Sequence, residues 1–339
     1  MTTNNEHWTP TRQARLPSGF DRTTTAEQVV AGRDLRGKLA LVTGGYSGVG
    51  RATVAALVGA GARVIVPAKR VEAAASALAG LPGVEIDELD LIDPASIDRF
   101  AARVRDKHGA LHLLINNAGI MAPPLVRDAR GYESQLATNH LGHFQLTARL
   151  WPALVAAGGA RVVALSSWGH RFAAVDFDDP SFERRDYDRW QAYGQSKTAN
   201  ALFAVALDRR GAPHGVRAFA VHPGRIITPL VRHMSADELR QARVIDEAGQ
   251  PIASAETKTP AQGAATSVWC ATSPALDGKG GVYCEDVDIA EIVQPNRQPA
   301  AQGLHDAAVE TGVMPHAIDP EAAERLWALS ERMTVAFAM

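Results

Sequence analysis

Short apolar segments alternate with helical segments along most of this chain of 339 residues. The apolar segments, which have strand character, lie at 38–43, 63–68, 84–91, 111–117, 160–167, 216–224 and 280–285. Segments with helical apolar spacing separate them, including a long one at 132–158 and one that begins near residue 193. Buried strands that alternate with helices favour a parallel sheet covered on both faces. We therefore predict an α/β fold, a doubly wound (Rossmann) parallel sheet in a single domain.

The same pattern predicts how the chain is organised. Residues 1–34 are expected to form an N-terminal arm and a short helix, capped by Thr25 with Gln28 or by Thr24 with Glu27. Residues 35–285 carry the sheet, and 286–339 form a C-terminal extension with a terminal helix. Segments 168–190, 225–259 and 285–318 interrupt the alternation, and each follows a strand. Because ligands bind beyond the carboxyl ends of such strands, these segments are expected to wall a substrate pocket.

Composition excludes several classes of protein. With 46% apolar and 21% charged residues and a net charge of −2, the chain has no basic surface for nucleic acid or membrane. No apolar run reaches the roughly 18 residues needed to span a bilayer. Cys270 and Cys284 lie in apolar segments and are expected to be reduced core residues of a cytoplasmic protein.

A glycine-rich stretch, TGGYSGVG at 43–50, lies between the first strand and the first long helix. Gly44, Gly48 and Gly50 would let the backbone approach a pyrophosphate, while the helix N-terminus offers free N–H groups to the anion. The stretch therefore predicts a dinucleotide site.

The end of the second strand indicates which dinucleotide. Sites that prefer NAD place an acid there, but Ala68 stands at that position and is followed by Lys69 and Arg70. Two cations suit a 2′-phosphate, so we predict NADP, with NAD as the alternative. Asp90, after the third strand, could accept a hydrogen bond from adenine, and the Asn-Asn-Ala-Gly run at 116–119 could line the adenine ribose.

Tyr193 and Lys197, in the stretch YGQSK, are four residues apart and would emerge on one face of a helix. A lysine one turn away could lower the pKa of the tyrosine and prepare it for proton transfer. His140 and His143 are three residues apart, but no third ligand is evident nearby, so no metal site is predicted.

These motifs occur in the order TGGYSGVG, NNAG, a serine pair after a strand, YGQSK and HPG. In that order they resemble the short-chain dehydrogenase/reductase family over about residues 35–285. The flanking sequences resemble the branch of the retinol dehydrogenases and the WW-domain oxidoreductase, in a bacterial version.

The resemblance implies a catalytic tetrad of Asn139, Ser167, Tyr193 and Lys197, with Asn139 holding a water beside Lys197. It also implies dimers or tetramers joined through the helices at 131–157 and 193–211. Two features depart from the family pattern: Ser167 and Tyr193 are 26 residues apart, about twice the commonest spacing, and position 46 is Tyr rather than Asn. The implied cofactor-binding residues are Gly44, Tyr46, Ser47, Gly48, Val49, Lys69, Arg70, Asp90, Leu91, Asn117, Ala118, Gly119, Tyr193, Lys197, Pro223, Gly224, Ile226 and Thr228.

The sequence therefore predicts an oxidoreductase that interconverts a secondary alcohol and a ketone or aldehyde with NADP(H). A non-catalytic dinucleotide-binding regulator and a C=C reductase or epimerase on the same scaffold are the alternatives. His170, Arg171 and Arg225 could contact a polar group of the substrate. An apolar or aromatic substrate is favoured by the apolar residues of the loops, Met121, Trp168, Phe172, Trp190, Ile226, Leu230 and Met234.

Overall fold

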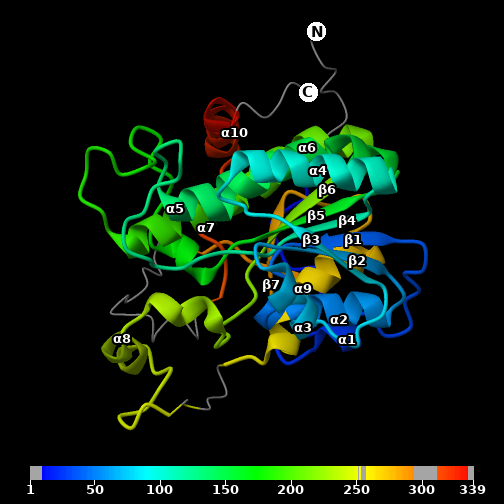
Figure 1. Cartoon of the computed structure of the whole chain (residues 1–339), viewed down its shortest axis with the longest axis horizontal. Helices are drawn as coiled ribbons and strands as arrows, with labels where there is room; N and C mark the ends of the chain where they lie inside the picture. The colour runs from blue at the N-terminus through cyan, green and yellow to red at the C-terminus, as the bar shows by residue number, and fades with distance from the viewer. Residues whose placement is uncertain (1–9, 251, 253–256, 294–310, 335–339) are drawn as a thin grey trace.

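A computed structural model describes residues 10–250, 252, 257–293 and 311–334. Within these residues, eight strands form one sheet in the order β3-β2-β1-β4-β5-β6-β7-β8 (Figure 1). The first seven strands are parallel, and β8 runs antiparallel to β7. The strands are β1 (Leu39–Val42), β2 (Arg63–Ala68), β3 (Val84–Glu88), β4 (Leu113–Asn116), β5 (Arg161–Leu165), β6 (Arg217–Val221), β7 (Val282–Glu285) and β8 (Asp288–Ile289).

Helices cover both faces of this sheet, which confirms the doubly wound α/β fold (Figure 1). One face carries α4 (Pro94–His108), α6 (Gly142–Ala156) and α7 (Arg189–Gly211). The other carries α1 (Ala26–Val29), α2 (Gly48–Gly59), α3 (Val71–Ala77) and α9 (Pro260–Thr272). In the described residues, none of the helices has the length and apolar character that crossing a bilayer requires.

Local signals set several helix ends where the sequence predicts them. The Asp93 carboxylate accepts the N–H of Ala95 at 2.9 Å, and Pro94 occupies the first turn of α4. Of the two capping boxes considered for α1, the structure forms the one between Thr25 and Gln28.

The long helix expected at 132–158 is present as a continuous helical segment from Ser134 to Ala156. A π-helical turn (Ala137–Leu141) within it joins α5 (Ser134–Leu136) to α6. The Asn139 side chain within this turn bonds to the backbone N–H and C=O of Ile120. One extra residue in a turn leaves the apolar spacing almost unchanged, so periodicity cannot reveal it.

Two elements follow strands where the sequence predicts only loops. Strand β8 returns antiparallel after a two-residue turn at Asp286 and Val287, both of which have positive φ. Helix α8 (Ala236–Gln241), capped by Ser235 and Glu238, lies in the 225–259 segment. A turn formed without glycine and a helix of six residues leave little periodic signal.

The N-terminal arm is attached to the sheet rather than extended from it. The Gln13 side chain accepts the N–H of Tyr283 at 2.9 Å and donates to the carbonyl oxygens of Tyr283 and Ala290. Further along, the N–H of Leu16 donates to the Asp288 carboxylate at 2.8 Å. The arm thus follows the β7–β8 end of the sheet before it enters α1.

The C-terminal helix α10 (Pro320–Thr334) packs on the outside of α6 and α7 (Figure 1). The Trp327 ring stacks on Phe203 and meets Phe144 edge-on, with centroids 6.2 and 5.0 Å away. Arg210 of α7 lies 4.2 Å from the Trp327 ring centroid and pairs with Glu324 at 2.6 Å. The part of α6 and α7 beneath Trp327 is therefore covered by the chain itself.

Candidate active site

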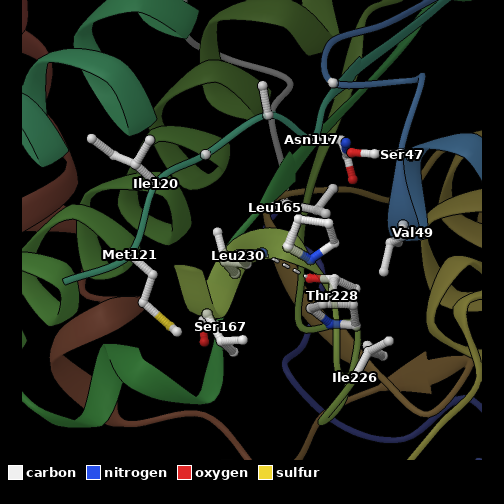
Figure 2. A pocket seen from close by; sticks show the side chains of 18 of the residues that line it. Ser47, Val49, Asn117, Ile120, Met121, Leu165, Ser167, Ile226, Thr228 and Leu230 are labelled. Atoms are coloured by element: carbon white, nitrogen blue, oxygen red, sulfur yellow. Dashed lines mark hydrogen bonds between the residues drawn. The ribbon is translucent and has the colours of Figure 1, made fainter. Parts of the chain in front are cut away.

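A cavity of about 1000 Å³ opens at the carboxyl ends of the parallel strands. Figure 2 shows it extending from Ser47, Val49 and Asn117 on one side to Met121 and Ser167 on the other. The cavity includes all of the predicted cofactor-binding residues and three of the four predicted catalytic residues, Ser167, Tyr193 and Lys197. Asn139 is fully buried and lies behind the cavity wall.

The glycine loop is shaped by close backbone contacts. A Cβ atom on Gly50 would lie 2.3 Å from the Gly44 carbonyl oxygen and 2.5 Å from the Asn117 side-chain nitrogen. Gly44 and Gly48 have φ values of +64° and +50°, which favour glycine.

The N-terminus of α2 beside this loop has room for an anion. Ser47 is the N-cap residue, and its side chain makes no capping hydrogen bond within the described structure. The first N–H groups of α2 therefore have no side-chain cap and can bind a phosphate. The loop and helix together fit a dinucleotide.

Lys69 and Asp90, which were predicted to bind the 2′-phosphate and the adenine, contact each other. The Lys69 ammonium pairs with the Asp90 carboxylate at 2.6 Å, and the Lys69 side chain is 70% exposed. The Asp90 carboxylate also accepts the N–H of Ile92. Arg70 is exposed at the N-cap of α3. Exposed ion pairs contribute only about 0–1 kcal/mol, so Lys69 can exchange Asp90 for a phosphate at small cost.

The three predicted catalytic residues in the cavity come from two elements. Ser167 lies two residues after the end of β5 and caps the short helical turn Trp168–Arg171. Tyr193 and Lys197 lie on one face of α7, with exposures of 4% and 5%, and the Ser167 hydroxyl hydrogen-bonds Tyr193. A side chain on Gly169 would lie 2.7 Å from the Tyr193 ring, so this glycine allows the ring its position.

The long interval between Ser167 and Tyr193 is accommodated by a loop held against α7. The Gln195 side chain accepts the N–H of Asp176 and donates to the Pro180 carbonyl, while Arg127 donates to the carbonyls of Ser181 and Phe182. These contacts hold the middle of the insert, residues 173–189, away from the cavity, so its length does not separate the two residues.

Lys197 and Asn139 form a buried layer beneath the cavity. The Lys197 ammonium donates to the Leu165 carbonyl at 3.0 Å and lies 5.7 Å from the centroid of the Tyr193 ring. The Asn139 amide donates to the Ser196 hydroxyl at 2.9 Å and to the backbone of Ile120. Its side chain therefore braces the segment after β4 against α7.

The net shift of the Tyr193 pKa is upward in this structure, against the lowering expected from Lys197. Burial raises the pKa of Tyr193 to about 12, although the hydrogen bond from Ser167 opposes the rise. Burial also lowers the pKa of Lys197 to about 8. Both shifts have the same cause, the loss of water around the charged form, and the ammonium is directed at a carbonyl oxygen instead of the phenol.

The apolar residues predicted for the substrate pocket do line the cavity, and so do Ile120, Val231, Ala242 and Val244. Of the three polar candidates, only Arg225 reaches it. His170 is fully buried, where its ring accepts the N–H of Met314 and bonds the Ser167 carbonyl. Arg171 donates to the carbonyls of Thr311 and Gly312. The wall near Tyr193 is thus mainly apolar.

Sequence reasoning missed five charged residues of the cavity, Arg22, Arg232, Lys258, Glu285 and Asp286. Lys258 pairs with Asp286 at 2.5 Å across 28 positions of the chain. Arg22 belongs to the N-terminal arm. No local motif surrounds these residues, since tertiary packing alone brings them to the site.

The two histidines of the long helix serve as internal contacts. His140 bonds the Ser330 hydroxyl of α10 at 2.7 Å, and His143 bonds the Thr43 hydroxyl at 2.9 Å. Across the described ranges, no group of three or more His, Cys, Asp or Glu side chains could hold a metal ion.

Comparison with known proteins identifies the family. The family model described as short chain dehydrogenase matches residues 38–239. A Streptomyces lividans protein named "Probable oxidoreductase" is 46% identical over 301 residues, which cover 87% of this chain and 96% of that protein. Human "Retinol dehydrogenase 12" is 36% identical over 302 residues, covering 87% and 86% of the two chains. This chain belongs to the short-chain dehydrogenase/reductase family, as its motifs predict.

A solved structure supports the same assignment. An uncharacterized protein from Mycobacterium Paratuberculosis matches 94% of this chain and 100% of its own, with 32% identity and a TM-score of 0.69. Membership makes the chain an oxidoreductase that uses a nicotinamide dinucleotide, NAD or NADP.

The glycine loop generates a paired prediction. Gly50→Ala should lower the free energy of unfolding by about 1–3 kcal/mol, because its methyl group would overlap the Gly44 carbonyl oxygen. It should also weaken dinucleotide binding at least about tenfold, since the loop must shift. Urea denaturation and fluorescence titration measure the two effects.

The matched control is Gly59→Ala at the last residue of the same helix, where an added Cβ meets nothing within 4 Å. That variant should be more stable by about 0.5–1 kcal/mol and bind the dinucleotide normally. Equal behaviour of the two variants would contradict the close-contact explanation of the loop.

Proposed function

We propose that this protein is an NADP(H)-preferring oxidoreductase that interconverts a secondary alcohol and a ketone or aldehyde, with Tyr193 as the general acid and base. One observation carries the proposal: Ser167, Tyr193 and Lys197 open onto the same cavity as the glycine loop. A carbonyl group in that cavity would thus meet both a proton donor and a bound dinucleotide.

The bound dinucleotide supplies the hydride, and the residues of the chain supply the proton and its placement. Tyr193 donates its phenolic proton to the carbonyl oxygen as the hydride reaches the carbonyl carbon. Ser167 donates a hydrogen bond to the same oxygen and stabilises the negative charge that develops there. The high pKa of Tyr193 keeps the phenol protonated at neutral pH. An alkoxide is a much stronger base than a phenolate, so the transfer remains downhill in the direction of reduction.

Lys197 acts on this step through Tyr193. Its ammonium lies one helical turn away on the same face of α7, and the reaction leaves a phenolate that this charge stabilises. Asn139 is proposed as a positioning residue, since its side chain joins Ser196 of α7 to the backbone of Ile120. Lys197 follows Ser196 in the helix, so this contact helps to position the backbone that carries the Lys197 side chain.

Support for NADP comes from the end of β2. Lys69 and Arg70 line the cavity, and the acid that would bind the ribose hydroxyls in an NAD site is replaced by the buried Ala68. The Asp90 carboxylate also lines the cavity, but it forms an ion pair with Lys69. The local charge therefore suits a 2′-phosphate.

Support for an apolar or aromatic substrate comes from the walls near Tyr193. Trp168 and Phe172 meet edge-on at 5.2 Å, and Phe172 and Trp190 at 6.0 Å. Met121 and Leu230 complete this side of the cavity, and Figure 2 shows both near Ser167. Such a wall gains most from binding a flat apolar body next to the reacting carbonyl.

Cellular location and assembly belong to the same proposal. Cys270 and Cys284 are free and buried, as expected in the reducing cytoplasm. A homodimer or homotetramer joined through α6 and α7 would have to form beside α10 or displace it, because Trp327 covers Phe144 and Phe203. We therefore propose that any self-association uses surfaces that α10 leaves open.

Replacing the proposed proton donor is the first test. Tyr193→Phe removes only the hydroxyl, so carbonyl reduction should fall by about 10²- to 10⁴-fold while NADPH binding changes little. Stopped-flow NADPH oxidation and fluorescence titration measure the two quantities. The matched variant Tyr132→Phe, outside the cavity, should keep wild-type rates. Retention of most activity in Tyr193→Phe would refute the assigned role.

The dinucleotide preference has its own test. The double variant Lys69→Ala, Arg70→Ala should bind NADPH at least about tenfold more weakly, since charged hydrogen bonds contribute about 1.5–3 kcal/mol each. NADH binding should change less than about threefold. A control that also removes two positive charges, Arg99→Ala with Lys107→Ala, lies outside the cavity and should leave both affinities unchanged. Equal losses of affinity for NADPH and NADH would mean that Lys69 and Arg70 act only as general surface charge.

A further inference from the structure

The N-terminal arm reaches the dinucleotide cavity. Arg22 lines the same cavity as the glycine loop, although it precedes Gly44 by 22 positions in the sequence. Its side chain is partly buried there. An arm that lies outside the matched family region, which begins at residue 38, therefore contributes a guanidinium group to the site.

Contacts on both sides of Arg22 hold it in place. Before it, Gln13 bonds the backbone of Tyr283, and Leu16 and Phe20 pack against the apolar core beneath α1, α2 and α9. After it, the N–H of Thr23 donates to the Asp21 carboxylate at 2.8 Å. The guanidinium is thus carried on a segment fixed at both ends.

These contacts direct Arg22 toward the glycine loop. The Thr23 carbonyl accepts a hydrogen bond from Gln262, in the first turn of α9, at 3.0 Å. The next residue of α9, Gly263, is so close to the loop that an added Cβ would lie 3.2 Å from Val49 and 2.7 Å from Ile226. The backbone next to Arg22 is therefore tied to α9, where that helix packs against Val49 of the glycine loop.

A bound pyrophosphate would carry negative charge that the side chains of the glycine loop do not balance. The glycine loop, residues 43–50, contains no charged side chain. The loop itself would offer a pyrophosphate its backbone N–H groups, the Ser47 hydroxyl and the N-terminus of α2.

We propose that Arg22 completes the dinucleotide site by binding the pyrophosphate from the N-terminal arm. The inference rests on the proposed dinucleotide function and adds a residue that the family region does not contain. A guanidinium presents two parallel N–H donors to phosphate oxygens, which gives a charged contact with defined geometry. Because the pyrophosphate is common to NADP and NAD, Arg22 acts on both dinucleotides alike.

The test compares the full-length protein with Arg22→Gln in fluorescence titrations with NADPH and NADH. Both dissociation constants should rise by about tenfold, and their ratio should stay at the wild-type value. Arg22→Lys should recover part of the affinity. Arg12→Gln, an exposed arginine of the same arm outside the cavity, should change neither constant. Thermal unfolding of each variant without dinucleotide checks that the arm stays folded.

Two results would overturn the proposal. Unchanged affinities for both dinucleotides would mean that Arg22 does not touch the ligand. A loss confined to NADPH would place Arg22 at the 2′-phosphate with Lys69 and Arg70. Failure of the wild-type protein to bind either dinucleotide would instead refute the proposed function on which the inference rests.

Discussion

The Thr43 hydroxyl links the strand before the glycine loop to the turn that carries Asn139. The geometry of the site depends on this link. Thr43 directly follows β1, and its hydroxyl oxygen accepts the N–H groups of Asn117 and Ala118 at 2.9 Å each. It also bonds the His143 ring at 2.9 Å, and the other ring nitrogen of His143 bonds the Asn139 carbonyl at 2.9 Å. Burial lowers the pKa of His143 to about 4, so the ring is neutral at pH 7 and can donate on one side and accept on the other. The glycine-loop strand and the turn that carries Asn139 are therefore linked by one buried chain of hydrogen bonds.

Burial has a second consequence for the chemistry. Tyr193 and Lys197 lie in a region with little water, which favours the neutral form of each. A protonated phenol next to an easily discharged ammonium suits proton delivery to a carbonyl oxygen. If water surrounded Tyr193 and Lys197, the pKa shifts that burial causes would be lost. In the proposed reaction, the apolar walls formed by Trp168, Phe172 and Trp190 would therefore favour the proton transfer as well as substrate binding.

Features that depend on local sequence could be predicted, and features that depend on distant contacts could not. The β2 bounds, the Asp93 cap and the glycine loop follow from short-range pattern, and all three lie as expected. The π-helical turn at Asn139 was not predicted, and neither was the hydrogen bond of its side chain to the distant backbone of Ile120.

The same holds for the charged residues. Lys69 and Asp90 were assigned separate roles, yet parallel pairing of β2 with β3 brings them together as an ion pair. The position of Arg22 follows from the contacts of the arm with β7 and α9, which no motif near residue 22 encodes.

The transfer of deuterium from NADPH labelled at C4 of the nicotinamide tests hydride transfer to a carbonyl most directly. Purified protein would be incubated with the labelled cofactor and a panel of aromatic ketones and enones, and the products analysed by mass spectrometry and NMR. We expect one deuterium on the carbon that bears the new hydroxyl group, and no labelled product from Tyr193→Phe. Deuterium on a carbon of a former C=C bond, or labelled alcohol formed equally well by Tyr193→Phe, would contradict carbonyl reduction with Tyr193 as the proton donor.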